Sequence, residues 1–111
     1  MITDEIRASI TKRASTDDEW DFGVKQCCDE EIAILSRNIE DTIAFLENDC
    51  TADEFSWLSE VFDDVAEKTQ SRAFVDCLYK VARKFPDECK EYHINRVIEY
   101  AEGAISEADD I

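Results

Sequence analysis

The stretch that most constrains the fold is the amphipathic segment of residues 51–70, TADEFSWLSEVFDDVAEKTQ. Thr51 and Glu54 form a capping box, in which each side chain can hydrogen-bond a backbone N–H group that the start of a helix leaves open. Apolar side chains then recur at helical spacing on one face: Phe55, Leu58, Val61, Phe62, Val65 and Ala66. The pattern predicts one continuous helix over residues 51–70 with one face buried in a core.

The opposite face of this predicted helix carries four carboxylates and a tryptophan: Asp53, Trp57, Glu60, Asp64 and Glu67. Like charges three or four residues apart destabilise an isolated helix by about 0.2–0.5 kcal/mol per pair. The fold gains nothing from this arrangement, so we interpret the stripe as a candidate partner-binding surface. The alternative is a solvated acidic face on which Trp57 packs against a neighbouring helix.

The remainder of the chain is also predicted to be helical. Only two glycines and one proline occur in 111 residues, whereas a β-rich chain needs such residues in its many tight turns. Helices are expected from about residue 3 to 14, over 17–22, over 29–48 as the longest, over 71–84, over 87–92 and over 94–105. Short links favour antiparallel neighbours. We expect an all-α fold, a compact bundle of about five to seven short antiparallel helices, in a single domain that spans residues 1–111.

Two short stretches bear on the acidic surface. Thr16 and Glu19 form a second capping box, which predicts a short helix that begins at Asp17 and ends near Gly23. Within it, acidic residues surround two aromatic side chains: Asp17, Asp18, Glu19 and Asp21 around Trp20 and Phe22. Either this is a binding loop with aromatic anchors, or the aromatic side chains pack inward and the acids form a solvated rim.

The acidic triplet 29–31 has a structural explanation, since carboxylates in the first turn of a helix suit its macrodipole.

Charge is distributed unevenly along the chain. Its formal net charge is −16, from 28 acidic and 12 basic residues. Residues 15–64 hold sixteen acids and only two bases, whereas residues 65–100 hold six acids and seven bases. Such a chain repels nucleic acid and anionic membrane and attracts basic surfaces. The asymmetry favours a dedicated acidic surface, to which the first helix, with Arg7, Lys12 and Arg13, is not expected to belong.

The cysteines predict neither a disulfide framework nor a metal site. There are five of them; Cys27 and Cys28 are adjacent, the others are scattered, and no C-x-x-C pair is present. We expect buried thiols in a reducing cytosol, with no metal. No apolar run approaches 18 residues and no leader follows Met1, so the sequence predicts a cytoplasmic protein that does not contact the membrane.

No catalytic motif is evident. His93 is the single histidine, and packing or a local hydrogen bond is the expected role for it. Nucleophile elbows, glycine-rich phosphate loops, metalloprotease motifs and calcium-binding loops are all missing from the sequence. We therefore expect no enzymatic activity, no cofactor and no small-molecule substrate.

The run FSWLSEVFDDVAEKTQSRAFVDCLYKVARKFP, continued by INRVIEYAEGAI, resembles a group of small acidic α-helical immunity proteins. These proteins accompany bacterial polymorphic toxins, particularly in contact-dependent growth inhibition systems. The resemblance covers roughly residues 52–105. It implies a cytoplasmic protein that binds a cognate toxin domain, often a nuclease, and blocks its active site or substrate groove. It implies no particular contact residue.

Together these observations predict a toxin inhibitor that binds its partner one to one. The expected partner-binding residues come from the two acidic stretches: Asp53, Trp57, Glu60, Asp64, Glu67, Asp17, Asp18, Glu19 and Trp20. Two alternatives stay open. One is an acidic nucleic-acid mimic that regulates a basic protein, and the other is a helical protein-interaction scaffold.

Overall fold

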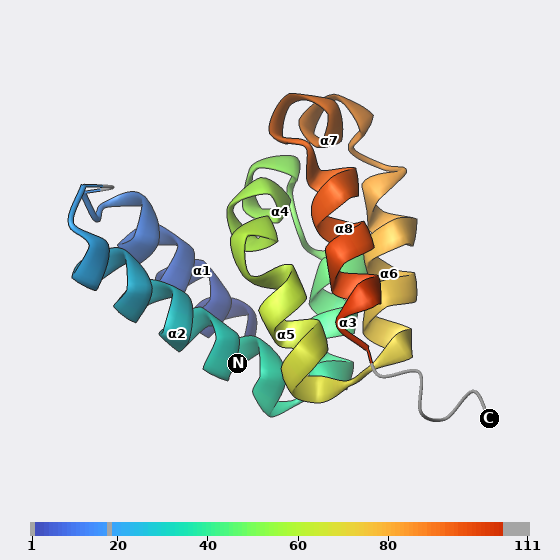
Figure 1. Ribbon diagram of the computed structural model, residues 1–111, viewed down its shortest axis with the longest axis horizontal. Coiled ribbons are helices and arrows are strands. Elements are labelled where there is room, and N and C mark those ends of the chain that lie inside the picture. The colour runs from blue at the N-terminus through green and yellow to red at the C-terminus, as the bar shows by residue number, and fades with distance from the viewer. Residues whose placement is uncertain (1, 18, 106–111) are drawn as a thin grey trace.

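Two antiparallel helices, α1 (Ile2–Ala14) and α2 (Asp21–Arg37), form a hairpin that lies against the other helices (Figure 1). The computed structural model describes residues 2–17 and 19–105. The other elements follow in order: α3 (Ile39–Asn48), α4 (Ala52–Leu58), the 3₁₀ turn η1 (Ser59–Val61), α5 (Phe62–Thr69), α6 (Arg72–Ala82), α7 (Pro86–Tyr92) and α8 (Ile94–Gly103). The described residues contain no strand, and the all-α prediction is confirmed.

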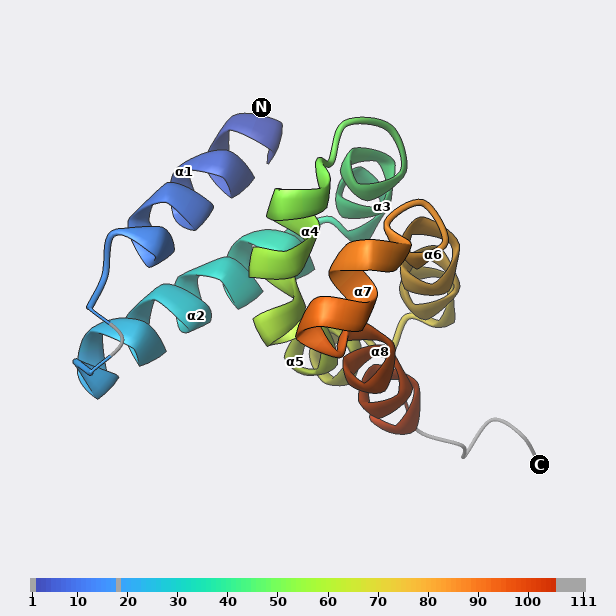
Figure 2. The same cartoon turned by 90° about the horizontal axis from the view of Figure 1, so that it is seen from above.

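The end of the hairpin where α1 passes into α2 extends away from the remaining helices (Figures 1 and 2). The opposite end of α2 leads directly into α3, and α2 also contacts η1 and α5. Helices α5, α6 and α8 pack together on the other side of the molecule. None of the described helices combines the length and the apolar composition that crossing a membrane requires.

The apolar face predicted for residues 51–70 lies at the centre of the core. All six of its members are fully buried: Phe55, Leu58, Val61, Phe62, Val65 and Ala66. The rings of Phe55 and Phe62 lie 5.1 Å apart between centroids, and Phe62 meets Phe74 of α6 edge to face at 6.2 Å. Such offset aromatic pairs add to the free energy gained from burial alone. This part of the prediction is confirmed.

The prediction of one continuous helix over 51–70 is wrong. The capping box of Thr51 and Glu54 forms as expected, but the helix is interrupted by η1 at residues 59–61. At this point two serine hydroxyls donate hydrogen bonds to the backbone carbonyl three residues earlier. Ser56 Oγ donates to the carbonyl of Asp53 at 2.7 Å, and Ser59 Oγ donates to the carbonyl of Ser56 at 2.6 Å. Serine hydroxyls that bind nearby carbonyls compete with the helical ladder and bend helices. The α-helix is therefore interrupted by a 3₁₀ turn at η1.

The predicted longest helix is also two helices. Residues 29–48 are divided at Asn38, whose extended backbone ends α2 and begins α3. Asn38 Oδ1 accepts a hydrogen bond from the backbone N–H of Asp41, and Thr42 Oγ1 donates to the carbonyl of Leu35 across the break at 2.8 Å. The break is therefore a capped junction.

At its other end, α2 begins at Asp21 and runs through Gly23, so the predicted short helix that ends near Gly23 is wrong. The acidic triplet 29–31 consequently lies in the middle of α2 rather than in a first turn, and the macrodipole explanation fails for it. Two of the triplet instead pair with lysines, Asp29 with Lys25 and Glu30 with Lys12.

Candidate partner-binding site

The loop between α1 and α2, together with the first turn of α2, exposes two large aromatic side chains. Trp20 is 58% exposed and Phe22 is 69% exposed, and their ring centroids lie 6.1 Å apart. The alternative in which these rings pack inward is wrong. We call residues 17 and 19–22, the described part of this region, the hairpin tip.

Gly23 explains how the tip places its tryptophan. A Cβ atom at position 23 would lie 2.3 Å from Cε3 of the Trp20 ring, so the ring rests directly against the glycine backbone. The turn before it is closed by the backbone N–H of Glu19, which donates to Asp17 Oδ1 at 2.9 Å. Trp20 itself precedes α2 and gives the helix no side-chain cap. The local structure thus holds the indole at the surface.

Carboxylates accompany the aromatic pair. Asp17, Glu19 and Asp21 are exposed, and none of them forms an ion pair within the described part of the chain. Asp18, which the sequence also placed in this set, lies outside the described residues. The hairpin tip is therefore a projecting surface that combines two exposed rings with acidic side chains.

The break at η1 divides the predicted stripe of residues 51–70. Asp53, Trp57 and Glu60 line a groove of about 620 Å³ between η1 and the α7–α8 end of the molecule, whereas Asp64 and Glu67 are not among its lining residues. Asp64 instead lies near Asp29 of α2, and burial together with the carboxylates of Asp63, Glu67 and Asp29 raises its pKa. Only three of the five residues therefore line the groove.

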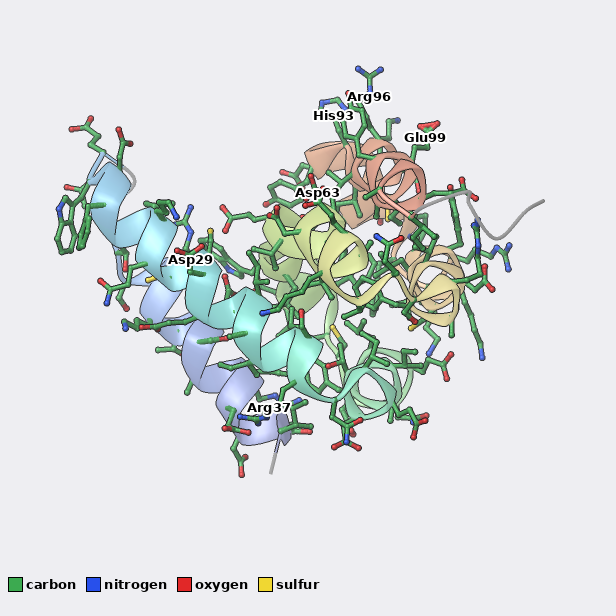
Figure 3. The ribbon with its side chains drawn as sticks, turned by 60° about the horizontal axis from the view of Figure 1, so that its bottom comes forward. Asp29, Arg37, Asp63, His93, Arg96 and Glu99 are labelled. Carbon is green, nitrogen blue, oxygen red and sulfur yellow. The ribbon has the colours of Figure 1, made fainter. Side chains whose placement is uncertain are left out.

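Further residues complete this surface, called the aromatic groove below; it is lined by Arg13, Asp53, Ser56, Trp57, Ser59, Glu60, Asp63, Tyr92, Val97 and Tyr100. Tyr92 and Tyr100 are exposed. Sequence reasoning did not find these tyrosines, because they come from α7 and α8, far from the acidic half of the chain. His93 projects outward together with Arg96 and Glu99 (Figure 3) and is exposed, so packing, one of the two roles expected for it, is not observed.

Arg13 lies at the inner side of the aromatic groove. Only 6% of the residue is exposed, and its guanidinium carbon is 5.6 Å from the centre of the Trp57 ring. Nη2 of Arg13 donates to Glu60 Oε1 at 2.7 Å and Nε donates to Oε2 at 2.9 Å. The expectation that α1 lies apart from the acidic surface is therefore wrong. Glu60 is held by this pair, and Trp57 is half-buried with its ring against the Arg13 guanidinium, in line with the packing alternative.

Other basic residues of the hairpin are similarly engaged. Arg7 binds Glu54 at 2.8 Å, and Arg37 pairs with Glu5. These pairs join α1 to α4 and α2 to α1. The acids in these ion pairs hold helices together, whereas the carboxylates of the hairpin tip form no ion pair within the described residues.

Comparison with known proteins found no match: no protein-family model, no curated protein and no solved structure is similar to this chain. The resemblance to immunity proteins stays a prediction.

Proposed function

We propose that this protein is an immunity protein that binds a cognate toxin domain one to one and inhibits it. The toxin domain is of the nuclease class, and its basic active site or substrate groove receives the hairpin tip. The protein has no catalytic part in this role.

The observation that carries the proposal is the exposed aromatic pair of the hairpin tip. Trp20 and Phe22 present large apolar rings to solvent on a projecting turn. Tryptophan is enriched among the few interface residues that contribute most of the binding energy, and such residues favour positions where a pocket of the partner excludes water. A projecting tip of this kind fits a concave site.

Charge supports the choice of partner. The unpaired carboxylates of Asp17, Glu19 and Asp21 surround the rings, within a stretch that holds sixteen acids and two bases over residues 15–64. A nuclease groove binds phosphates through lysine and arginine side chains. The carboxylates of the hairpin tip would be attracted to the same lysine and arginine side chains. Such charge complementarity speeds association and disfavours acidic partners.

The ion pairs of the hairpin support a preformed tip. Arg13 with Glu60 and Arg7 with Glu54 join α1 to η1 and α4. Helices held in this way lose little conformational freedom on binding, and a preorganised surface binds more tightly because less entropy is lost.

The experiment is a calorimetric titration of the C-terminal toxin domain encoded by the gene immediately upstream, at about 50 mM and about 500 mM salt. The proposal predicts one-to-one binding that weakens in high salt, together with loss of toxin activity at equal concentrations. Absence of binding at both salt concentrations would refute the immunity function. Tight binding that is indifferent to salt would keep the function and remove the acidic tip from it.

A further inference from the structure

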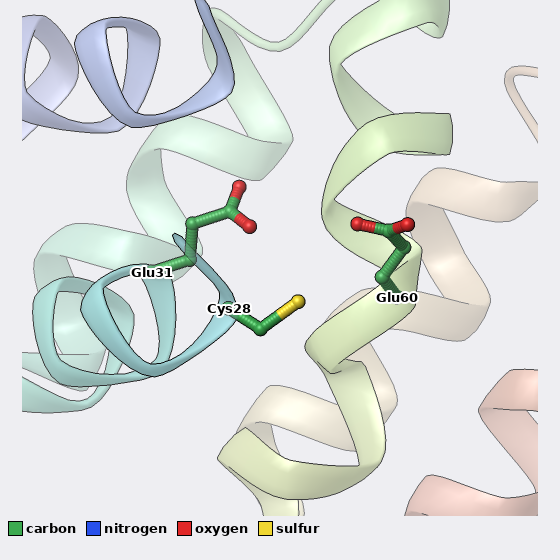
Figure 4. Close-up of side chains that lie close together, drawn as sticks. All are labelled: Cys28, Glu31 and Glu60. Carbon is green, nitrogen blue, oxygen red and sulfur yellow. The ribbon is translucent and has the colours of Figure 1, made fainter. Parts of the chain in front are cut away.

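Three side chains that could hold a metal ion point into one space between α2 and η1 (Figure 4). Cys28 and Glu31 lie one helical turn apart on α2, and Glu60 comes from η1. The sulfur of Cys28 and one carboxylate oxygen from each glutamate all lie within 4.8 Å of one another. It is the one such group of three or more in the described part of the chain.

Glu31 is the unusual member. Its side chain is fully buried, with 0% exposure, and neither carboxylate oxygen has a hydrogen-bond partner within the described residues. Burial, and secondarily the charge of Glu60, raise the pKa of Glu31 to about 8. A buried polar group without a partner is costly and rare in folded proteins. The position therefore calls for a further group that can interact with both oxygens.

We propose that Cys28, Glu31 and Glu60 form a binding site for a divalent transition-metal ion of the zinc class. A thiolate with two carboxylates is a donor set that Zn²⁺ accepts, with bonds of about 2.3 Å to sulfur and about 2.0–2.2 Å to oxygen. Mg²⁺ and Ca²⁺ take oxygen ligands and would not use the cysteine. The three side chains need to close by only about an ångström or two to reach such distances.

Access and charge are compatible with this site. The Glu60 side chain is 34% exposed and lines the aromatic groove, so an ion can enter from that side and solvent can supply a fourth ligand. Arg13 already orients the Glu60 carboxylate, as outer residues do around metal ligands. A dication together with the Arg13 guanidinium would balance the three anionic ligands. Burial raises the pKa of the Cys28 thiol to about 11, and coordination would release its proton.

The test is equilibrium dialysis of the chelator-treated protein against Zn²⁺ alone, with Co²⁺ as a spectroscopic probe. The proposal predicts one Zn²⁺ per chain, a higher melting temperature with Zn²⁺ but not with Mg²⁺, and a thiolate-to-Co²⁺ charge-transfer band. Cys28→Ser removes that band and weakens Zn²⁺ binding by about 100-fold or more, since even outer-shell changes cost about 10–100-fold. Glu31→Gln weakens binding similarly.

Cys50→Ser is the matched control, because Cys50 is also half-buried and lies outside the cluster. It should leave both the band and the affinity unchanged. Failure of the wild-type protein to give the Co²⁺ band, or Zn²⁺ binding that survives Cys28→Ser, would overturn the proposal. The wild-type spectrum decides the matter even if a variant fails to fold, and neither result depends on a toxin partner.

Discussion

Arg13 binds both oxygens of the Glu60 carboxylate, with Nη2–Oε1 and Nε–Oε2 distances of 2.7 and 2.9 Å. This pair joins the first helix of the hairpin to the turn that interrupts residues 51–70. The Arg13 guanidinium also lies against the Trp57 ring, and only 6% of Arg13 is exposed to solvent. The contact is therefore one of those that fix the hairpin, and hence its tip, relative to the other helices.

Arg13→Met should therefore lower the free energy of unfolding by about 2–4 kcal/mol, because it leaves the Glu60 charge without its partner. This is somewhat less than for a fully buried pair, since the Glu60 side chain is 34% exposed. In this case Glu60 would remain beside the buried Glu31. Urea unfolding followed by circular dichroism measures the loss. Lys12→Met is the control, since it breaks an exposed pair with Glu30, and exposed pairs contribute little. Equal effects of the two substitutions would contradict the importance of the Arg13 pair.

Metal-free protein should lose stability as the pH rises from about 4.5 to about 8, the pKa values of Glu31 when unfolded and folded. Over this range the folded state holds a proton on Glu31 that the unfolded state has released, so folding becomes less favourable. Cys28, Glu60 and Arg13 face this group, and of these only Arg13 favours its ionised form.

The difference between wild type and Glu31→Gln isolates this effect, because the other carboxylates titrate in both proteins. Urea unfolding with chelator present measures the free energy of unfolding of both proteins. Relative to wild type, this free energy should rise for the variant by several kcal/mol between the two pH limits. A difference that does not change with pH would show that Glu31 titrates normally.

Gly23→Ala should separate the placement of Trp20 from the stability of α2. Alanine is favoured over glycine inside a helix by about 1 kcal/mol, but its Cβ would lie 2.3 Å from the Trp20 ring. The exposed ring can move away, so we expect unchanged or higher stability together with altered Trp20 fluorescence in a Trp57→Phe background. Toxin affinity should fall about tenfold, the loss of one well-placed contact.

Gly103→Ala is the matched control, since nothing lies within 4 Å of a Cβ atom at that position. Its tryptophan fluorescence and toxin affinity should match those of the parent protein. Identical fluorescence for Gly23→Ala and its parent would contradict the contact between Trp20 and Gly23.

Asn38→Ala should weaken the junction between α2 and α3. The Asn38 side chain caps α3 by accepting from the N–H of Asp41, and loss of such a cap costs about 1 kcal/mol. Chemical denaturation can compare this change with Asn48→Ala, a substitution at an exposed position at the end of α3. If both substitutions cost the same, the capping role of Asn38 is wrong.

Much of the fold could be predicted because local rules and burial agree. The apolar arc from Phe55 to Ala66 is buried throughout, and Ser71 begins α6 by accepting from the N–H of Phe74. Helical periodicity and capping residues are properties of a few adjacent positions, so one sequence is enough to detect them.

The helix breaks and much of the candidate site depend on interactions that periodicity does not record. Apolar spacing continues across Asn38 and Ser59, while side-chain hydrogen bonds interrupt the helices there. The pairing of Arg13 with Glu60 joins residues 47 positions apart. Tyr92 and Tyr100 reach the groove only through the packing of α7 and α8. Such contacts are tertiary, and one amphipathic pattern is compatible with many of them.

The most direct test of the central claim is a calorimetric comparison of two double variants against the upstream-encoded toxin domain. Trp20→Ala with Phe22→Ala removes the rings of the hairpin tip, and Tyr92→Ala with Tyr100→Ala removes exposed rings of the aromatic groove. Both pairs are exposed, so neither change should unfold the protein. We predict that the tip variant loses about 2–4 kcal/mol of binding free energy while the groove variant binds like wild type. Wild-type affinity of the tip variant, with loss confined to the groove variant, would contradict the account.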